Sequence, residues 1–93
     1  MKLSESEFKK LAQSHKEPAD HLKLAEHFTA HAMEHEADAK MHEDLAAPYE
    51  KIHPQLAGEA RHYAAHSREA AEAMRNMAKI HQELAKQHTH AHA

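Results

Sequence analysis

The chain has 93 residues, of which 13 are histidine and none is cysteine. Without cysteine it cannot form disulfides, thiolate zinc sites or iron–sulfur clusters, and a single glycine excludes the glycine-rich loops that bind nucleotides. The formal charge is −3 with neutral histidines, and full protonation would add 13 positive charges as the pH falls through about 6.5. The acidic balance argues against a nucleic-acid partner, and no apolar run reaches membrane-spanning length.

A short helix is predicted over residues 1–16. Ser4 and Glu7 form an S-x-x-E pattern, in which two side chains bond to backbone amides at the start of a helix. Alanine, glutamate, lysine and leucine dominate the chain and β-branched residues are rare, which favours helix over strand. We therefore expect an all-α fold in a single domain over residues 1–93.

Prolines divide the rest of the chain into two long helices, predicted over residues 17–48 and 53–88. Pro48 should end or kink the first of these, because proline lacks a backbone N–H and clashes with the preceding turn. Pro54 suits the first turn of the other helix. A connection of about six residues makes the two helices antiparallel neighbours, and residues 89–93 are predicted to be a flexible tail.

Both long helices repeat every seven residues, a pattern typical of coiled-coil packing. Alanine recurs at 25, 32, 39 and 46 and at 64, 71, 78 and 85, where small side chains let two backbones approach closely. A first helix of about three turns is too short to cover the apolar flank of such a hairpin. We expect an antiparallel helical hairpin with a short N-terminal helix that dimerises into a four-helix bundle, with a monomeric three-helix domain as the alternative.

Polar residues occupy seam positions where a coiled coil normally requires apolar ones. The second helix has five such positions, and three histidines of the third helix are expected to face them. These eight residues are the predicted metal ligands: His21, His31, His35, Asp38, His42, His62, His66 and His81. Histidines four residues apart share one face of a helix, and imidazole nitrogen is a standard ligand of zinc, copper and nickel.

Facing residues follow from a turn centred near residues 50 and 51. Three layers of metal site are then predicted, composed of His21 and His81; of His31, His35, Asp38, His66 and Glu69; and of His42, His62 and Glu59. For the first layer, a hydrogen bond between the two rings is an equally good interpretation. His62 is expected to be solvated unless a dimer partner reaches it.

Copper or zinc is the predicted ion, and nickel fits the same ligands. Di-iron and haem centres are disfavoured, because the core lacks the required glutamates and the alanine-rich seam leaves little room for a porphyrin. The alternating histidines of the tail would add a loose metal-collecting segment: His88, His90 and His92.

Three segments resemble a type of small exported bacterial helical protein with repeated His-Glu-x-Leu/Met-Ala pieces. They are DHLKLAEHF at residues 20–28, MHEDLA around His42 and IHQELA around His81. The resemblance implies a helical fold and a periplasmic or secreted location, and it implies no activity. The N-terminal MKLSESEFKK has no apolar region of a signal peptide, so the location stays open.

These observations predict a binding protein that stores, buffers or delivers a transition metal. The alternatives are a pH-responsive helical interaction module without metal, since burial lowers the pKa of an imidazole, and a metalloenzyme with an open coordination position. No catalytic residue is predicted, because neither Ser14 nor Ser67 belongs to an evident triad, and a non-enzymatic role is favoured. The predicted partners are metal ions and a second copy of the chain.

Overall fold

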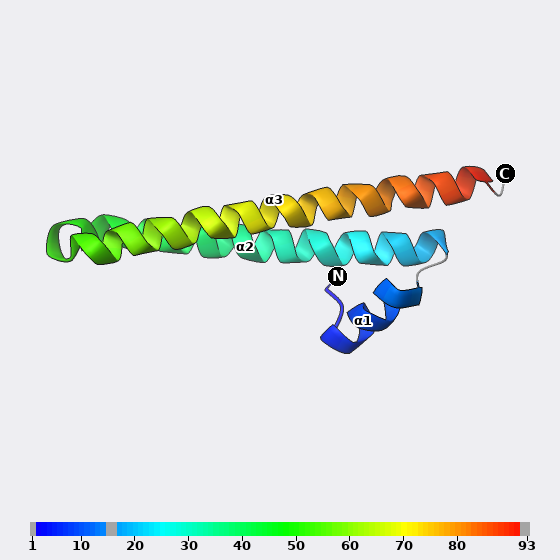
Figure 1. Cartoon of the computed structure of the whole chain (residues 1–93), viewed down its shortest axis with the longest axis horizontal. Helices are drawn as coiled ribbons and strands as arrows, with labels where there is room; N and C mark the ends of the chain where they lie inside the picture. The colour runs from blue at the N-terminus through cyan, green and yellow to red at the C-terminus, as the bar shows by residue number, and fades with distance from the viewer. Residues whose placement is uncertain (1, 15–16, 92–93) are drawn as a thin grey trace. The chain divides into compact units, whose positions relative to one another are not determined.

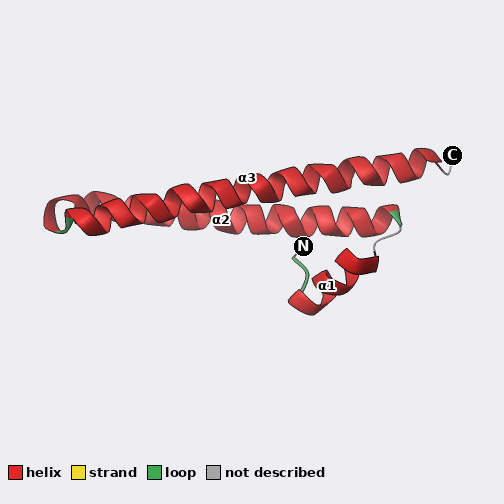
Figure 2. Cartoon of the chain, viewed as in Figure 1, coloured by secondary structure: helices red, strands yellow, loops and turns green. Residues whose placement is uncertain are grey.

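In the computed structural model of the chain, the described residues form three α-helices joined by short loops. The structure describes residues 2–14 and 17–91, with side chains up to Gln87. The helices are α1 (Glu5–Ser14), α2 (Pro18–Ile52) and α3 (Pro54–Ala91) (Figure 1). No strand occurs in this part of the chain (Figure 2). The predicted all-α class is therefore confirmed.

The sequence predicts that the second helix ends or kinks at Pro48, and in the structure this helix continues through Pro48 to Ile52. A proline inside a helix costs about 3 kcal/mol, because a hydrogen bond is lost and the ring crowds the preceding turn. The helical pattern nevertheless resumes, since His53 N–H donates to the carbonyl of Tyr49 at 2.7 Å. Ala46, just before the proline, is 1% exposed. We attribute the continued helix to this packing, which offsets the lost bond.

A single residue, His53, connects α2 to α3 in place of the predicted connection of about six residues. Its N–H belongs to the pattern of α2, while its carbonyl accepts the N–H of Ala57 at 3.1 Å and so starts α3. Pro54 follows at the first helical position, where no N–H is needed. The last helix runs to Ala91 and includes part of the predicted tail. Residues 92 and 93 lie outside the described residues.

The chain divides into two compact units, and each is described separately. The first unit comprises Met1–His31 and Met74–Ala93. Its core is a cluster of buried side chains from α2 and α3: Leu24, Ala25, Phe28 and Ala78. Partly buried apolar side chains from α1 and α3 pack against that core: Phe8, Leu11, Met74 and Met77. In this unit α1 therefore lies against the long helices through two of its side chains.

The first helix begins with the capping box that the sequence predicts. Glu7 N–H donates to Ser4 Oγ at 3.2 Å, and Ser4 N–H donates to Glu7 Oε1 at 3.4 Å. None of the residues Glu5–Ser14 is buried. Because α1 makes few apolar contacts, we expect it to detach from the first unit more readily than the long helices separate.

The second unit, Ala32–Ala73, is built around alanine. Its buried apolar side chains recur every seven residues on both helices: Ala32, Ala39 and Ala46 on α2, and Ala57, Ala64 and Ala71 on α3. Ser67 is buried with them. A single methyl group at each position lets two backbones approach more closely than leucine would. The two long helices of this unit thus pack against each other through an alanine seam, the six residues just named.

The polar residues predicted to fill this seam lie at its edge instead. In the second unit His35, Asp38 and His42 are half-buried, and Leu45 and Tyr49 are 41% and 36% exposed. The reason is steric, because the narrow gap between alanine-packed backbones does not hold larger side chains. These histidines are therefore closer to solvent than the sequence predicts.

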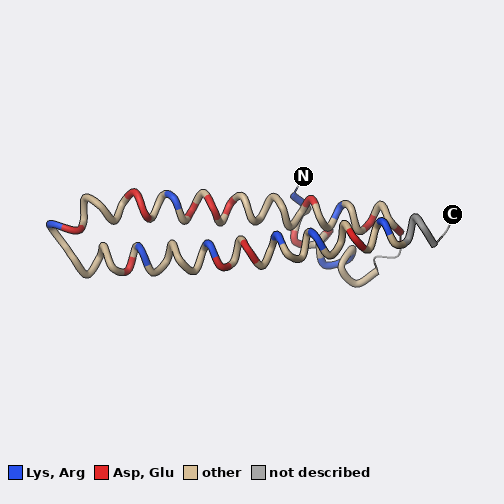
Figure 3. The backbone as a smooth tube through the Cα atoms, turned by 90° about the horizontal axis from the view of Figure 1, so that it is seen from above, with Lys and Arg blue, Asp and Glu red and all other residues tan. Residues whose placement is uncertain are grey.

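Charged residues of both signs are interspersed along α2 and α3 (Figure 3). This mixture is typical of helix faces in contact with water. Among the described residues, no helix combines the length and the apolar character needed to cross a membrane.

Candidate functional site

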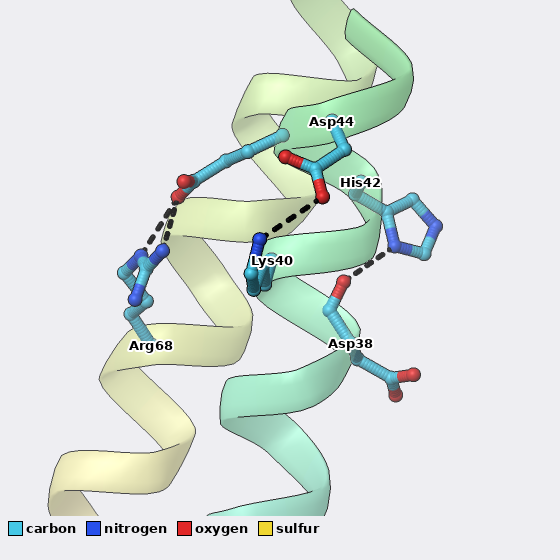
Figure 4. A network of polar contacts seen from close by, with 6 residues as sticks. Asp38, Lys40, His42, Asp44 and Arg68 are labelled. Atoms are coloured by element: carbon cyan, nitrogen blue, oxygen red, sulfur yellow. Dashed lines mark hydrogen bonds and ion pairs between the residues drawn. The ribbon is translucent and has the colours of Figure 1, made fainter.

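One flank of the alanine seam carries ion pairs between the two helices of the second unit. Arg68 Nε donates to Glu43 Oε1 at 2.7 Å, and Arg61 Nη2 donates to Glu50 Oε2 at 3.1 Å. The two glutamates are seven residues apart, as are the two arginines, and this spacing is the signal in the sequence that the predictions did not use. Figure 4 shows Arg68 and His42 on opposite sides of α2, so the flank with the ion pairs is distinct from the side that carries His42.

The neighbours of His42 determine which of its ring nitrogens carries the proton. Its Nδ1 is 2.8 Å from the backbone carbonyl oxygen of Asp38 (Figure 4). A carbonyl oxygen only accepts hydrogen bonds, so Nδ1 donates and the lone pair of the neutral ring is on Nε2. The ring packs on Tyr63, with centroids 4.1 Å apart. Tyr63 thus occupies the place expected for its neighbour His62.

An exposed histidine pair on α3 has its nitrogens directed at each other. His62 and His66 are one turn apart, their Nε2 atoms are 3.0 Å apart, and their rings are nearly perpendicular at 89°. The other nitrogen of His66, Nδ1, is 3.6 Å from Glu69 Oε2. The side chains of His66 and Glu69 are 63% and 74% exposed, so ions in solution have access to the pair.

A second histidine pair lies in the first unit and joins α2 to α3. The Nδ1 atoms of His21 and His81 are 3.0 Å apart, as the sequence predicts for facing residues. His21 is 2% exposed, and Phe28 stacks on His81 with an interplanar angle of 9°. This contact fits a hydrogen bond between two neutral rings, because two imidazolium ions at this distance would repel each other.

His27, which the predictions left out, holds the N-terminal segment of the first unit. Leu3 N–H donates to His27 Nδ1 at 3.0 Å, and Phe8 stacks on the ring with centroids 4.4 Å apart. His27 is 4% exposed. A cavity of about 540 Å³ lies beside it, and its lining includes Phe28 and Met74 together with the polar residues Lys2 and Glu5. In the sequence, His27 precedes Phe28 and no pattern marks it as buried. Its burial depends on α1, because Phe8 of that helix covers the ring.

The other predicted ligands do not join these pairs to form a complete metal site. His31 is half-buried in the first unit and its ring contacts His27, with centroids 4.6 Å apart. His35 and Asp38 are half-buried in the second unit. Across the described part of the chain, no three histidine or acidic side chains are placed to hold one ion. The three predicted layers are therefore not preformed ligand sets within one chain.

The predicted metal-collecting histidines of the tail have side chains outside the described residues: His88, His90 and His92. Comparison of the chain with protein-family models, with curated proteins and with solved structures finds no match. The resemblance to exported helical proteins stays a prediction. The geometry of the histidine pairs is therefore the basis of the proposed function.

Proposed function

We propose that this protein binds a transition-metal ion, copper or zinc, through paired histidines, and that it stores, buffers or delivers the ion. The observation that carries the proposal is the 3.0 Å separation of the Nε2 atoms of His62 and His66. Two nitrogens bound to one tetrahedral ion at about 2.0–2.1 Å are themselves roughly 3.3 Å apart. The metal-free pair therefore needs only a small adjustment to become two ligands of one ion.

Glu69 supports the role of His66 as a ligand. Its carboxylate is on the Nδ1 side of the ring, 3.6 Å away, while Nε2 faces His62. A carboxylate in this position favours the tautomer with the proton on Nδ1 and the lone pair on Nε2. Metal-bound histidines commonly have such a partner, which orients the ring and makes the coordinating nitrogen more basic.

Metal binding exchanges a hydrogen bond for two coordinate bonds. In the metal-free chain, one Nε2 donates its proton to the other across 3.0 Å. With Glu69 favouring His66 as the acceptor, His62 is the donor. When an ion binds, His62 adopts the tautomer with its proton on Nδ1, and its Nε2 coordinates the ion. Both rings stay neutral, so binding releases no net proton. Protonated rings repel the ion and each other, so affinity falls as the pH drops.

The His21–His81 pair is the second candidate metal site, in the first unit. Its nitrogen separation is the same, 3.0 Å, but His21 is buried and Phe28 covers His81. An ion reaches these nitrogens only if the rings separate. We therefore propose that the pair serves mainly as a hydrogen bond in the core, with the exposed pair as the principal metal site.

We also propose that two copies associate into a four-helix bundle. Large apolar side chains of the second unit are exposed on both sides of the connection at His53: Leu45, Tyr49, Ile52, Leu56 and Tyr63. Ile52 is 70% exposed. Covering apolar surface is worth roughly 25 cal/mol per Å², and a second copy supplies the same residues in symmetric arrangement.

Calorimetric titration of Zn²⁺ and Cu²⁺ into the tag-free chain at pH 7.5 tests the metal proposal. We expect saturable binding that His66→Ala weakens at least tenfold. His53→Ala is the matched control, because His53 is also an exposed histidine and its bonds to Tyr49 and Ala57 are made by its backbone. Equal affinity in both variants, or no saturable binding in the unaltered chain, would contradict the proposal.

A second candidate function is that of a pH-responsive interaction module, and it is supported by His27. Its Nδ1 accepts the N–H of Leu3, which requires a neutral ring. A proton on this nitrogen removes the acceptor, so acid favours release of the N-terminal segment. The cavity lined by Phe8, Phe28 and Met74 would then become an open apolar surface for a partner.

A further inference from the structure

We infer that the ion at His62 and His66 is shared by two copies of the chain, each supplying its histidine pair to one four-nitrogen site. This inference rests on the proposed metal binding and adds its partner and stoichiometry, one ion per two chains. The observation that supports it is the exposed pair of His62 and His66 on the outer face of α3, which offers two of the four nitrogens.

One chain provides too few ligands at this position. Structural zinc sites have four protein ligands, and catalytic sites have three. Within the described residues no group of three histidine or acidic side chains can hold an ion. The nearby carboxylate of Glu69 faces Nδ1 of His66, whereas the ion would lie between the Nε2 atoms. Two coordination positions therefore remain for ligands from another molecule.

The surface around the pair allows another helix to approach. Gly58 lies one turn before His62 on the same side of α3, and an added Cβ there would meet no atom within 4 Å. Ala65 is also exposed on this helix. A second copy can therefore bring its own imidazoles close without displacing large side chains of the first.

Charge makes the contact depend on the cation. Glu59 lies three residues before His62, and Glu69 lies three residues after His66, so acidic groups flank the pair on both sides. In a symmetric pair of copies these carboxylates approach those of the partner and repel them. A divalent ion bound by four neutral imidazoles offsets this repulsion, whereas its removal restores it.

A two-fold symmetric contact supplies the two missing ligands from the same histidine pair of the second copy. A two-fold axis through the ion relates the two copies, so His62 and His66 of one chain and the same pair of the other complete a tetrahedral set. The contact is self-complementary and joins two copies through one ion, on a surface separate from the one proposed for the four-helix bundle. It uses the outer face of α3 and leaves the alanine seam intact.

Sedimentation velocity of the tag-free chain, with and without Zn²⁺, tests the inference together with calorimetric stoichiometry. We expect zinc to double the molecular mass relative to the metal-free sample, at one ion per two chains, and a chelator to reverse the change. His66→Ala should abolish the doubling, and His53→Ala should leave it unchanged. Saturable zinc binding at one ion per chain with an unchanged mass would overturn the inference and keep the proposed function. No saturable zinc binding would overturn both.

A bulky residue at Gly58 distinguishes this contact from association elsewhere. Gly58→Trp introduces a large side chain into open space and leaves the imidazoles of its own chain in place. We expect this variant to bind zinc with weaker affinity and without doubling of the mass, while circular dichroism shows an unchanged helix content. Doubling in Gly58→Trp equal to that of the unaltered chain would place the contact elsewhere and overturn the inference.

Discussion

Arg68 contacts Glu43 through two of its nitrogens, Nε and Nη2, each 2.7 Å from the same carboxylate oxygen. The contact links α3 to α2 in the second unit, and Arg61 repeats it with Glu50 one heptad away. Both pairs lie on one flank of the alanine seam. They join residues of α2 and α3 that face each other across this flank.

Reversing one charge of this contact should destabilise the second unit. Glu43→Arg places two cations opposite each other, and we expect a loss of about 1 kcal/mol or less, since the pair is half exposed and screened by water. The double exchange Glu43→Arg with Arg68→Glu should recover most of the loss. Urea unfolding followed by circular dichroism measures both. A double variant no more stable than Glu43→Arg would show that the contact does not set the register.

The alanine seam should tolerate no larger side chain. Ala64 is 1% exposed, and Ala64→Leu should lower the free energy of unfolding by about 1–3 kcal/mol, because overpacking pushes the backbones apart. Ala65, its exposed neighbour, is the matched control, and Ala65→Leu should change stability by less than about 0.5 kcal/mol. Thermal unfolding compares them. Similar effects of the two substitutions would argue against close packing at residue 64.

We expect the N-terminal segment to stay bound to His27 when the pH is above the titration range of imidazole, and to be released when the pH is below that range. The bond from Leu3 N–H requires neutral His27, so its contribution is present at neutral pH and is lost as the pH falls. His27→Phe keeps a ring against Phe8 but removes the acceptor. We expect this variant to exchange the Leu3 amide roughly fivefold faster at pH 7, as loss of about 1 kcal/mol implies.

Hydrogen exchange measured by NMR across pH 5 to 8 checks this behaviour. In the unaltered chain, protection of Leu3 beyond the intrinsic pH dependence should decrease toward pH 5, whereas in His27→Phe it should stay low throughout. Protection that is constant with pH in the unaltered chain would contradict the role of His27.

The carboxylate behind His66 should strengthen metal binding. Glu69→Gln removes the negative charge 3.6 Å from Nδ1, and we expect zinc affinity to fall about tenfold, the lower end of such effects, because the site is exposed. Glu72→Gln, which removes an exposed charge on the next turn, should leave the affinity within about twofold. Competition titration with a chromogenic chelator measures both. A similar decrease in the two variants would indicate a general charge effect instead of orientation of His66.

The sequence allowed prediction of the helices and of the capping box at Ser4, because composition and local side-chain bonds determine these features. It did not allow prediction of the helix through Pro48 or of the one-residue joint at His53. Both depend on packing of Ala46 and Ala57 across the seam, and propensity alone does not include that packing.

The candidate site was predicted in part. The facing of His21 and His81 followed from the expected turn centre near residues 50 and 51, and the pairing of His62 with His66 followed from their spacing of one turn. The expected middle layer failed to assemble, since alanine occupies the centre of the seam and His35 lies at its edge. The expected turn centre placed His62 opposite His42, whereas Tyr63 lies there, and only a tertiary contact reveals that shift.

The most direct test of the account is a zinc titration followed by ¹H–¹⁵N spectra of the imidazole rings. We predict that the Nε2 signals of His62 and His66 move together, saturate at one ion per two chains, and report both rings with the proton on Nδ1. His53 should not respond. Small shifts of all the histidines in proportion to added zinc, with no saturation at His62 and His66, would contradict the claim that this pair is a metal site.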